Sequence, residues 1–158
     1  CLVMRFHPLE AADLARALDR GAPGLDPATR EAALVVSAGS PGAALSFAEH
    51  DLGKAWLAMK RLVAEGDPDF VLRADLSTAL GQRPDRERLL ALLEAARMLL
   101  VGTLATADDA TRLRVVEAHA RLTGIAAQAP TYNFDPSLLL MEIGALLASV
   151  ARTRESAS

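Results

Sequence analysis

The stretch AGSPGAALSFAE, residues 38–49, has the residue types of a helix start that could meet an anion. Ser40 is a favoured N-cap, Pro41 suits the first helical position, and Gly42 leaves the backbone bare in the first turn. Free N–H groups at such an end attract phosphate. However, no Lys or Arg lies between Arg30 and Lys54. The segment therefore predicts the geometry of a phosphate site without its positive charge.

The histidines and the cysteine do not form a metal-binding pattern. His7, His50 and His119 are far apart in the chain, and neither H-x-x-x-H nor C-x-x-C occurs. His119 shares a predicted helix face with aliphatic residues, which favours a partly buried structural role. Cys1 has no basic neighbour that would activate it as a nucleophile. We therefore expect no metal, no cofactor and no catalytic residues, so the chain is predicted not to be an enzyme.

Paired carboxylates occur at Asp67/Asp69 and at Asp108–Asp109. Both pairs fall where a helix is predicted to begin, and negative charge there complements the helix dipole. Capping is thus favoured over acid–base catalysis. The neighbouring arginines alternate with acids and lack interleaved aromatics, which indicates solvated helix faces or protein contacts; they are Arg83, Arg86, Arg88, Arg112, Arg114 and Arg121.

Composition limits the classes of protein further. The 158 residues are 51% hydrophobic but only 4% aromatic, which favours an aliphatic, alanine-rich helical core. A net charge of −3 and a pI near 5.6 argue against direct binding of DNA or of an anionic membrane. A single cysteine excludes an internal disulfide, so we expect a cytoplasmic location. The sequence contains no run of 18 apolar residues.

The first third of the chain predicts one strand and three short helices. Residues 2–6 (LVMRF) alternate as a strand does, but no second strand is predicted after them, so its sheet is expected to lie outside this chain. Helices are predicted from Pro8 to about Arg20, from the Asp26–Pro27 pair to about Ser37, and from Ser40 to about His50.

A longer set of helices is predicted after residue 52. A stripe of Leu52, Trp56, Met59 and Val63 marks the first, over 52–65, and places Trp56 in the core. Others are predicted over 67–81, starting at Asp67–Pro68, and over 84–104, with a wide apolar set typical of a central helix. The last two are predicted from a capping box of Thr106 and Asp109 to Gln128, and from Asp135–Pro136 to about Val150. The predicted fold class is all-α.

The order of features in residues 1–50 resembles AAA+ clamp-loader ATPases, in particular the delta-prime subunit family of the bacterial DNA polymerase III clamp loader. CLVMRFHPL is similar to the segment at the family's Ser-Arg-Cys box: a cysteine, a last core strand and the entry into the lid helices. GSPGAAL (39–45) is similar to the start of the third lid helix. ATP-hydrolysing subunits carry their sensor-2 arginine there. In this chain Gly42 takes that place, so the resemblance implies a degenerate sensor-2 segment of Gly39, Ser40, Pro41 and Gly42 that binds no nucleotide.

The resemblance implies two parts: the end of a core strand plus a three-helix lid over 1–52, and a helical collar domain over 53–158. Beyond residue 50 the likeness is architectural. The implied function is non-catalytic assembly within the clamp loader, with other subunits as collar partners and the sliding clamp reached only through them. The alternative is a partner- or ligand-binding helical domain of a transcriptional regulator. Because Cys1 is not an initiator Met, we also expect a longer parent protein that contains the AAA+ core.

Two further expectations concern surfaces. The predicted collar carries more aliphatic surface than a five-helix bundle needs, notably at Leu99, Leu100, Val101 and Leu104. Part of this surface is expected to be covered by neighbouring subunits, because large exposed apolar patches mark interfaces. Residues 2–6 are expected to stay outside the helical core.

Overall fold

The computed structural model describes residues 7–81, 83–129 and 134–151, and within them the fold is all-α, as predicted. No strand occurs in these ranges, and the predicted strand at 2–6 lies outside them. The helices are α1 (Ala11–Gly21), α2 (Pro27–Val36), α3 (Pro41–Ala48), α4 (Gly53–Glu65), α5 (Val71–Leu80), α6 (Arg86–Thr103), α7 (Asp109–Gln128) and α8 (Pro136–Ala148).

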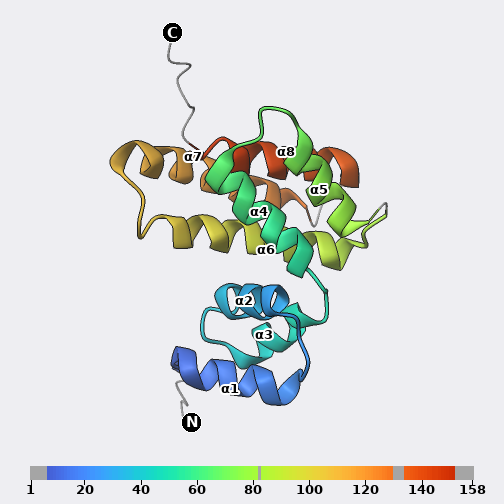
Figure 1. Cartoon of the computed structure of the whole chain (residues 1–158), viewed down its shortest axis with the longest axis vertical. Coiled ribbons are helices and arrows are strands. Elements are labelled where there is room, and N and C mark those ends of the chain that lie inside the picture. The colour runs from blue at the N-terminus through green and yellow to red at the C-terminus, as the bar shows by residue number, and fades with distance from the viewer. Residues whose placement is uncertain (1–6, 82, 130–133, 152–158) are drawn as a thin grey trace.

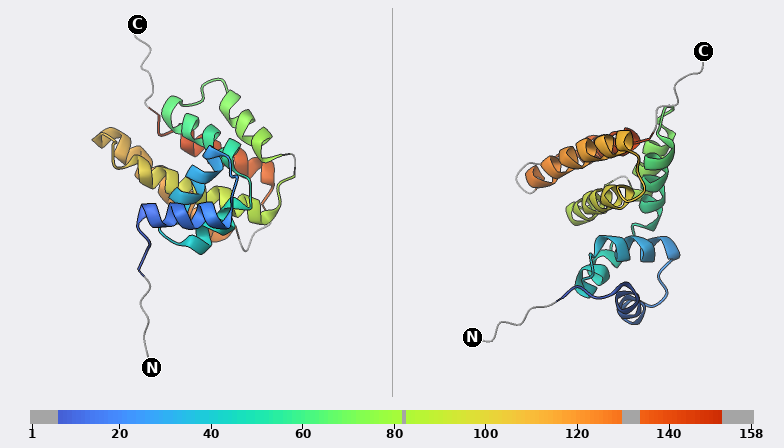
Figure 2. Two further views of the ribbon diagram at one scale, coloured as in Figure 1. Left: turned by 60° about the horizontal axis from the view of Figure 1, so that its bottom comes forward. Right: turned by 90° about the vertical axis from the view of Figure 1, so that its left-hand side faces the viewer.

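The helices form two groups along the long axis of the molecule (Figure 1). Helices α1, α2 and α3 pack on one another at the N-terminal end, and α4 to α8 form the larger group. Helix α2 lies between them, since it contacts both α4 and α6. The views of Figure 2 show α6 and α7 running side by side while α4 crosses them. The hydrophobic core runs without a break through both groups.

Local capping explains where most helices begin. In five helices an N-cap side chain accepts a hydrogen bond from an amide of the first turn, which satisfies a donor that has no partner inside the helix. These N-caps are Asp26, Ser40, Asp85, Asp108 and Asp135. Three of the five helices also have proline at or next to the first position.

Four predicted helix starts are wrong. Helix α6 begins at Arg86, after its N-cap Asp85, and not at Pro84. Helix α1 begins at Ala11 and not at Pro8. Helix α7 is capped by Asp108, whose carboxylate accepts from the Thr111 amide, so the predicted Thr106/Asp109 capping box does not form. Helix α5 begins at Val71, because Pro68 lies in a turn rather than at the first helical position.

The core confirms the predicted stripes. Leu52, the N-cap of α4, and Trp56 and Met59 within α4 are fully buried, and Val63 packs partly buried against the core. Helix α6 is central because it contacts α2, α4, α7 and α8. The predicted excess of apolar surface on α6 is mostly inside the protein. Leu100 is buried, Leu99 and Leu104 pack against the core, and Val101 is the exposed member, at 44%.

The two groups meet closely at the start of α4. A Cβ at Gly53 would lie 2.5 Å from Thr29 Oγ1 and 2.7 Å from Asp26 Oδ1, so only glycine allows this approach to α2. Nearby, Lys60 of α4 pairs with Glu31 of α2 at 2.7 Å. The Glu31 pKa lies below its usual range chiefly because of the hydrogen bond from Lys60. The junction is therefore well packed.

Candidate functional site

The predicted sensor-2 segment forms the start of α3, the third helix of the N-terminal group. Ser40 is the N-cap, Pro41 is the first helical residue, and Ser40 Oγ accepts from the Ala43 amide at 3.3 Å. A Cβ added at Gly42 would find open space. The structure therefore forms the predicted helix start and leaves room at Gly42 for a larger side chain.

Gly39 has a packing role that the sequence did not reveal. Its φ of +87° is left-handed, and an added Cβ would lie 2.6 Å from Pro8 Cβ. Its carbonyl also accepts a hydrogen bond from the Leu9 amide at 3.0 Å. Gly39 thus contacts the segment that leads into α1. Both its left-handed φ and the close approach of Pro8 favour glycine at this position.

The structure keeps the histidines apart. His7 is exposed, while His50 and His119 are partly buried on α3's C-terminal turn and on α7. Among the described residues, no three side chains of His, Cys, Asp or Glu come together as metal ligands would. The partial burial of His119 is as predicted.

The carboxylate at Asp67 has the strongest set of partners in the region of α5. Its side chain is only 2% exposed. It accepts from the amides of Leu72 (2.9 Å) and Arg73 (3.2 Å) and from Arg73 Nε (2.8 Å). The predicted capping role is thus confirmed for Asp67, although it acts from outside the helix and across five residues. The structure gives no such role to Asp69.

Burial and hydrogen bonding act in opposite directions on Asp67. Burial raises the pKa of the carboxyl, and the hydrogen bonds from Arg73 and from the two amides lower it by more. The net pKa therefore lies below its ordinary value, and Asp67 stays ionised at neutral pH.

The Arg73 side chain, which pairs with this carboxylate, also contacts Phe70 and α8. Its guanidinium lies 4.2 Å from the centre of the Phe70 ring, and Phe70 has a left-handed backbone with φ of 61°. Its aliphatic stem crosses α8 at Gly144, where an added Cβ would lie 2.6 Å from Arg73 Cγ. Asp67 and Arg73 therefore attach the start of α5 to the middle of α8.

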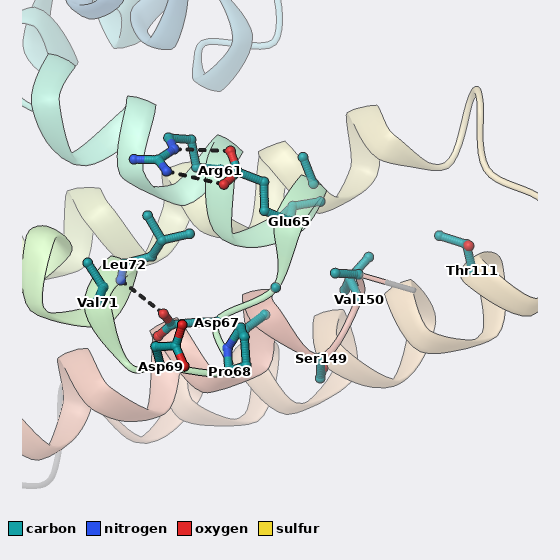
Figure 3. Close-up of a pocket in the computed structure, with 15 residues that line it drawn as sticks. Arg61, Glu65, Asp67, Pro68, Asp69, Val71, Leu72, Thr111, Ser149 and Val150 are labelled. Carbon is teal, nitrogen blue, oxygen red and sulfur yellow. Dashed lines mark hydrogen bonds and ion pairs between the residues drawn. The ribbon is translucent and has the colours of Figure 1, made fainter. Parts of the chain in front are cut away.

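A groove opens beside this ion pair (Figure 3). It measures about 1190 Å³ and is lined by the end of α4, the turn into α5, the start of α7 and the residues just after α8. Arg61 and Glu65 on its wall form a two-bond ion pair, at 3.0 and 3.1 Å. The Thr111 hydroxyl accepts from Arg114 at 2.9 Å. Among the described residues that line the groove there is no His, Cys or Lys, and Arg61, Glu65 and Thr111 each have a side-chain partner.

Three arginines bridge helix ends in the larger group, a role that sequence reasoning missed. Arg86 donates to the carbonyl of Ala129, the C-cap of α7, at 3.0 Å. Arg88 donates to the carbonyls of Leu80, at the end of α5, and of Asp51, both at 3.2 Å. Arg114 donates to the Val150 carbonyl after α8, at 3.2 Å. The carbonyls of Leu80, Ala129 and Val150 lie at or just beyond helix ends, where a helix leaves such groups unpaired. Arg88 and Arg114 are partly buried, so the predicted solvated faces are wrong for these two, whereas Arg86 is exposed.

The remaining distinctive feature is apolar surface. Leu138, Met141 and Ala145 form an exposed row on α8, spaced three and four residues apart. A second exposed row on α7 consists of Leu113, Val116 and Ala120. Such rows are typical of contact surfaces.

Comparison with models of protein families, with curated proteins and with solved structures finds no match to this chain. A bilayer-spanning helix is also not found, because none in the described ranges is both long and apolar enough.

Proposed function

We propose that this chain is a non-catalytic assembly part of a bacterial DNA polymerase III clamp loader, similar to the lid and collar of a delta-prime subunit. On this proposal residues 1–52 end a core strand and form the lid, and residues 53–158 form the collar that joins neighbouring subunits. It would act in the cytoplasm and reach the sliding clamp through its partners.

The observation that carries the proposal is the place of the GSPG segment. The resemblance expects it at the start of the third helix of a three-helix lid. The segment does begin the third helix of an N-terminal three-helix group, with Ser40 as N-cap and Pro41 first. A helix start of this kind favours phosphate, and the place of the sensor-2 arginine is taken by Gly42. This combination supports a nucleotide sensor that has lost its charge.

The larger group supports the assembly part of the proposal. Its buried residues belong to the core shared with α1–α3, yet α7 and α8 keep apolar rows on their outer sides. Rows of this kind are what a subunit of a larger assembly needs for neighbours.

Co-purification tests the proposal. The chain would be co-expressed with the clamp-loader ATPase and delta subunits of its own organism and analysed by size-exclusion chromatography with mass determination. We expect one complex that contains all three proteins. Elution of the chain by itself, with the other two assembled, would contradict the proposal.

Calorimetric titration with ATP tests the non-catalytic part. No P-loop sequence occurs in the chain, and Gly42 supplies no charge. We expect no measurable binding heat at micromolar protein. Saturable binding of micromolar affinity would argue against a degenerate sensor-2 segment.

A further inference from the structure

We draw no further inference here: the strongest candidate, the groove between the end of α4, the turn into α5, the start of α7 and the residues just after α8, carries nothing, because nothing in the structure shows what covers it.

Discussion

The two helix groups hold their helices together in different ways. In α1–α3 the ion pairs lie at the surface, as between Arg30 and Asp19, where both side chains are exposed. In α4–α8 arginines reach from one helix to the end of another, and the Asp67–Arg73 pair is nearly enclosed. Surface pairs contribute little to stability, while polar groups withdrawn from water are costly to leave unpaired. The larger group is therefore stabilised by arginine side chains that hydrogen-bond to helix ends, whereas the ion pair within the smaller group lies at its surface.

Removal of the Asp67 carboxylate should have the largest effect. Asp67→Ala leaves the Arg73 guanidinium and two amides without their acceptor beside α8. We expect the free energy of unfolding to fall by about 2–4 kcal/mol. Urea denaturation followed by circular dichroism measures it. Asp69→Ala is the matched control two residues away, and an equal loss there would show that Asp67 has no special role.

The same carboxylate should make stability depend on pH. Its pKa is lower in the folded state than in the unfolded one, so ionised Asp67 stabilises the fold above about pH 4 and this contribution is lost as the pH falls through the folded-state pKa. The stability gap between wild type and Asp67→Asn should thus be constant from pH 6 to 8 and should narrow below about pH 4. A gap that widens in acid would contradict this sign.

Arg88→Met should have the next effect. The substitution keeps an apolar stem and removes the donors to the carbonyls of Leu80 and Asp51. Two lost hydrogen bonds, one of which holds the connection between α3 and α4, should lower the free energy of unfolding by about 1–2 kcal/mol in urea denaturation. Arg83→Met, at an exposed position in the turn before α6, is the control. Equal midpoints for the two variants would mean that the bridge does not contribute.

Substitution by alanine should have opposite effects on stability at Gly53, where α4 approaches α2 closely, and at Gly42, where the start of α3 is open. In Gly53→Ala the new Cβ meets Thr29 and Asp26, which should cost about 1 kcal/mol even though alanine favours the helix. In Gly42→Ala the Cβ meets no atom within 4 Å, so a gain of about 0.5 kcal/mol is expected. Thermal denaturation of both variants should therefore show shifts of opposite sign, and shifts of one sign would refute the packing argument.

The Arg30–Asp19 pair should give the smallest effect. Its two bonds, 2.7 and 2.9 Å, lie at the exposed surface of α1 and α2. A double-mutant cycle with Arg30→Ala and Asp19→Ala should yield a coupling close to the error of the measurement, and 0.5 M NaCl should remove what there is. A coupling free energy as large as the loss expected for Asp67→Ala would contradict the view that ion pairs contribute less to stability in α1–α3 than in α4–α8.

Sequence alone predicted the parts of this fold that neighbouring residues determine. Asp26, Ser40 and Asp135 each cap a helix within three residues, so their helix starts could be expected. The periodicity of α4 and of α6 likewise identified the core. Asp67 could be recognised as a cap, but its reach to Arg73 depends on a turn with left-handed Phe70, which no local pattern indicated.

The bridging arginines show where sequence reasoning stops. Arg86 and Ala129 are 43 residues apart, and nothing near either one signals the contact. An arginine among acids has the same local pattern whether it faces water or another helix. For the same reason, the excess apolar surface was predicted on α6 but lies on α7 and α8, because only the packed arrangement decides which side of a helix is covered.

The bond between Arg88 and Asp51 has a consequence for synthesis of the chain. The two residues are 37 positions apart, and at 5–20 residues per second a ribosome needs about 2–7 s to add that stretch. During this interval α2 has been made, while α6, against which it packs, has not. A newly made α1–α3 segment therefore waits for seconds with the side of α2 that faces α6 uncovered.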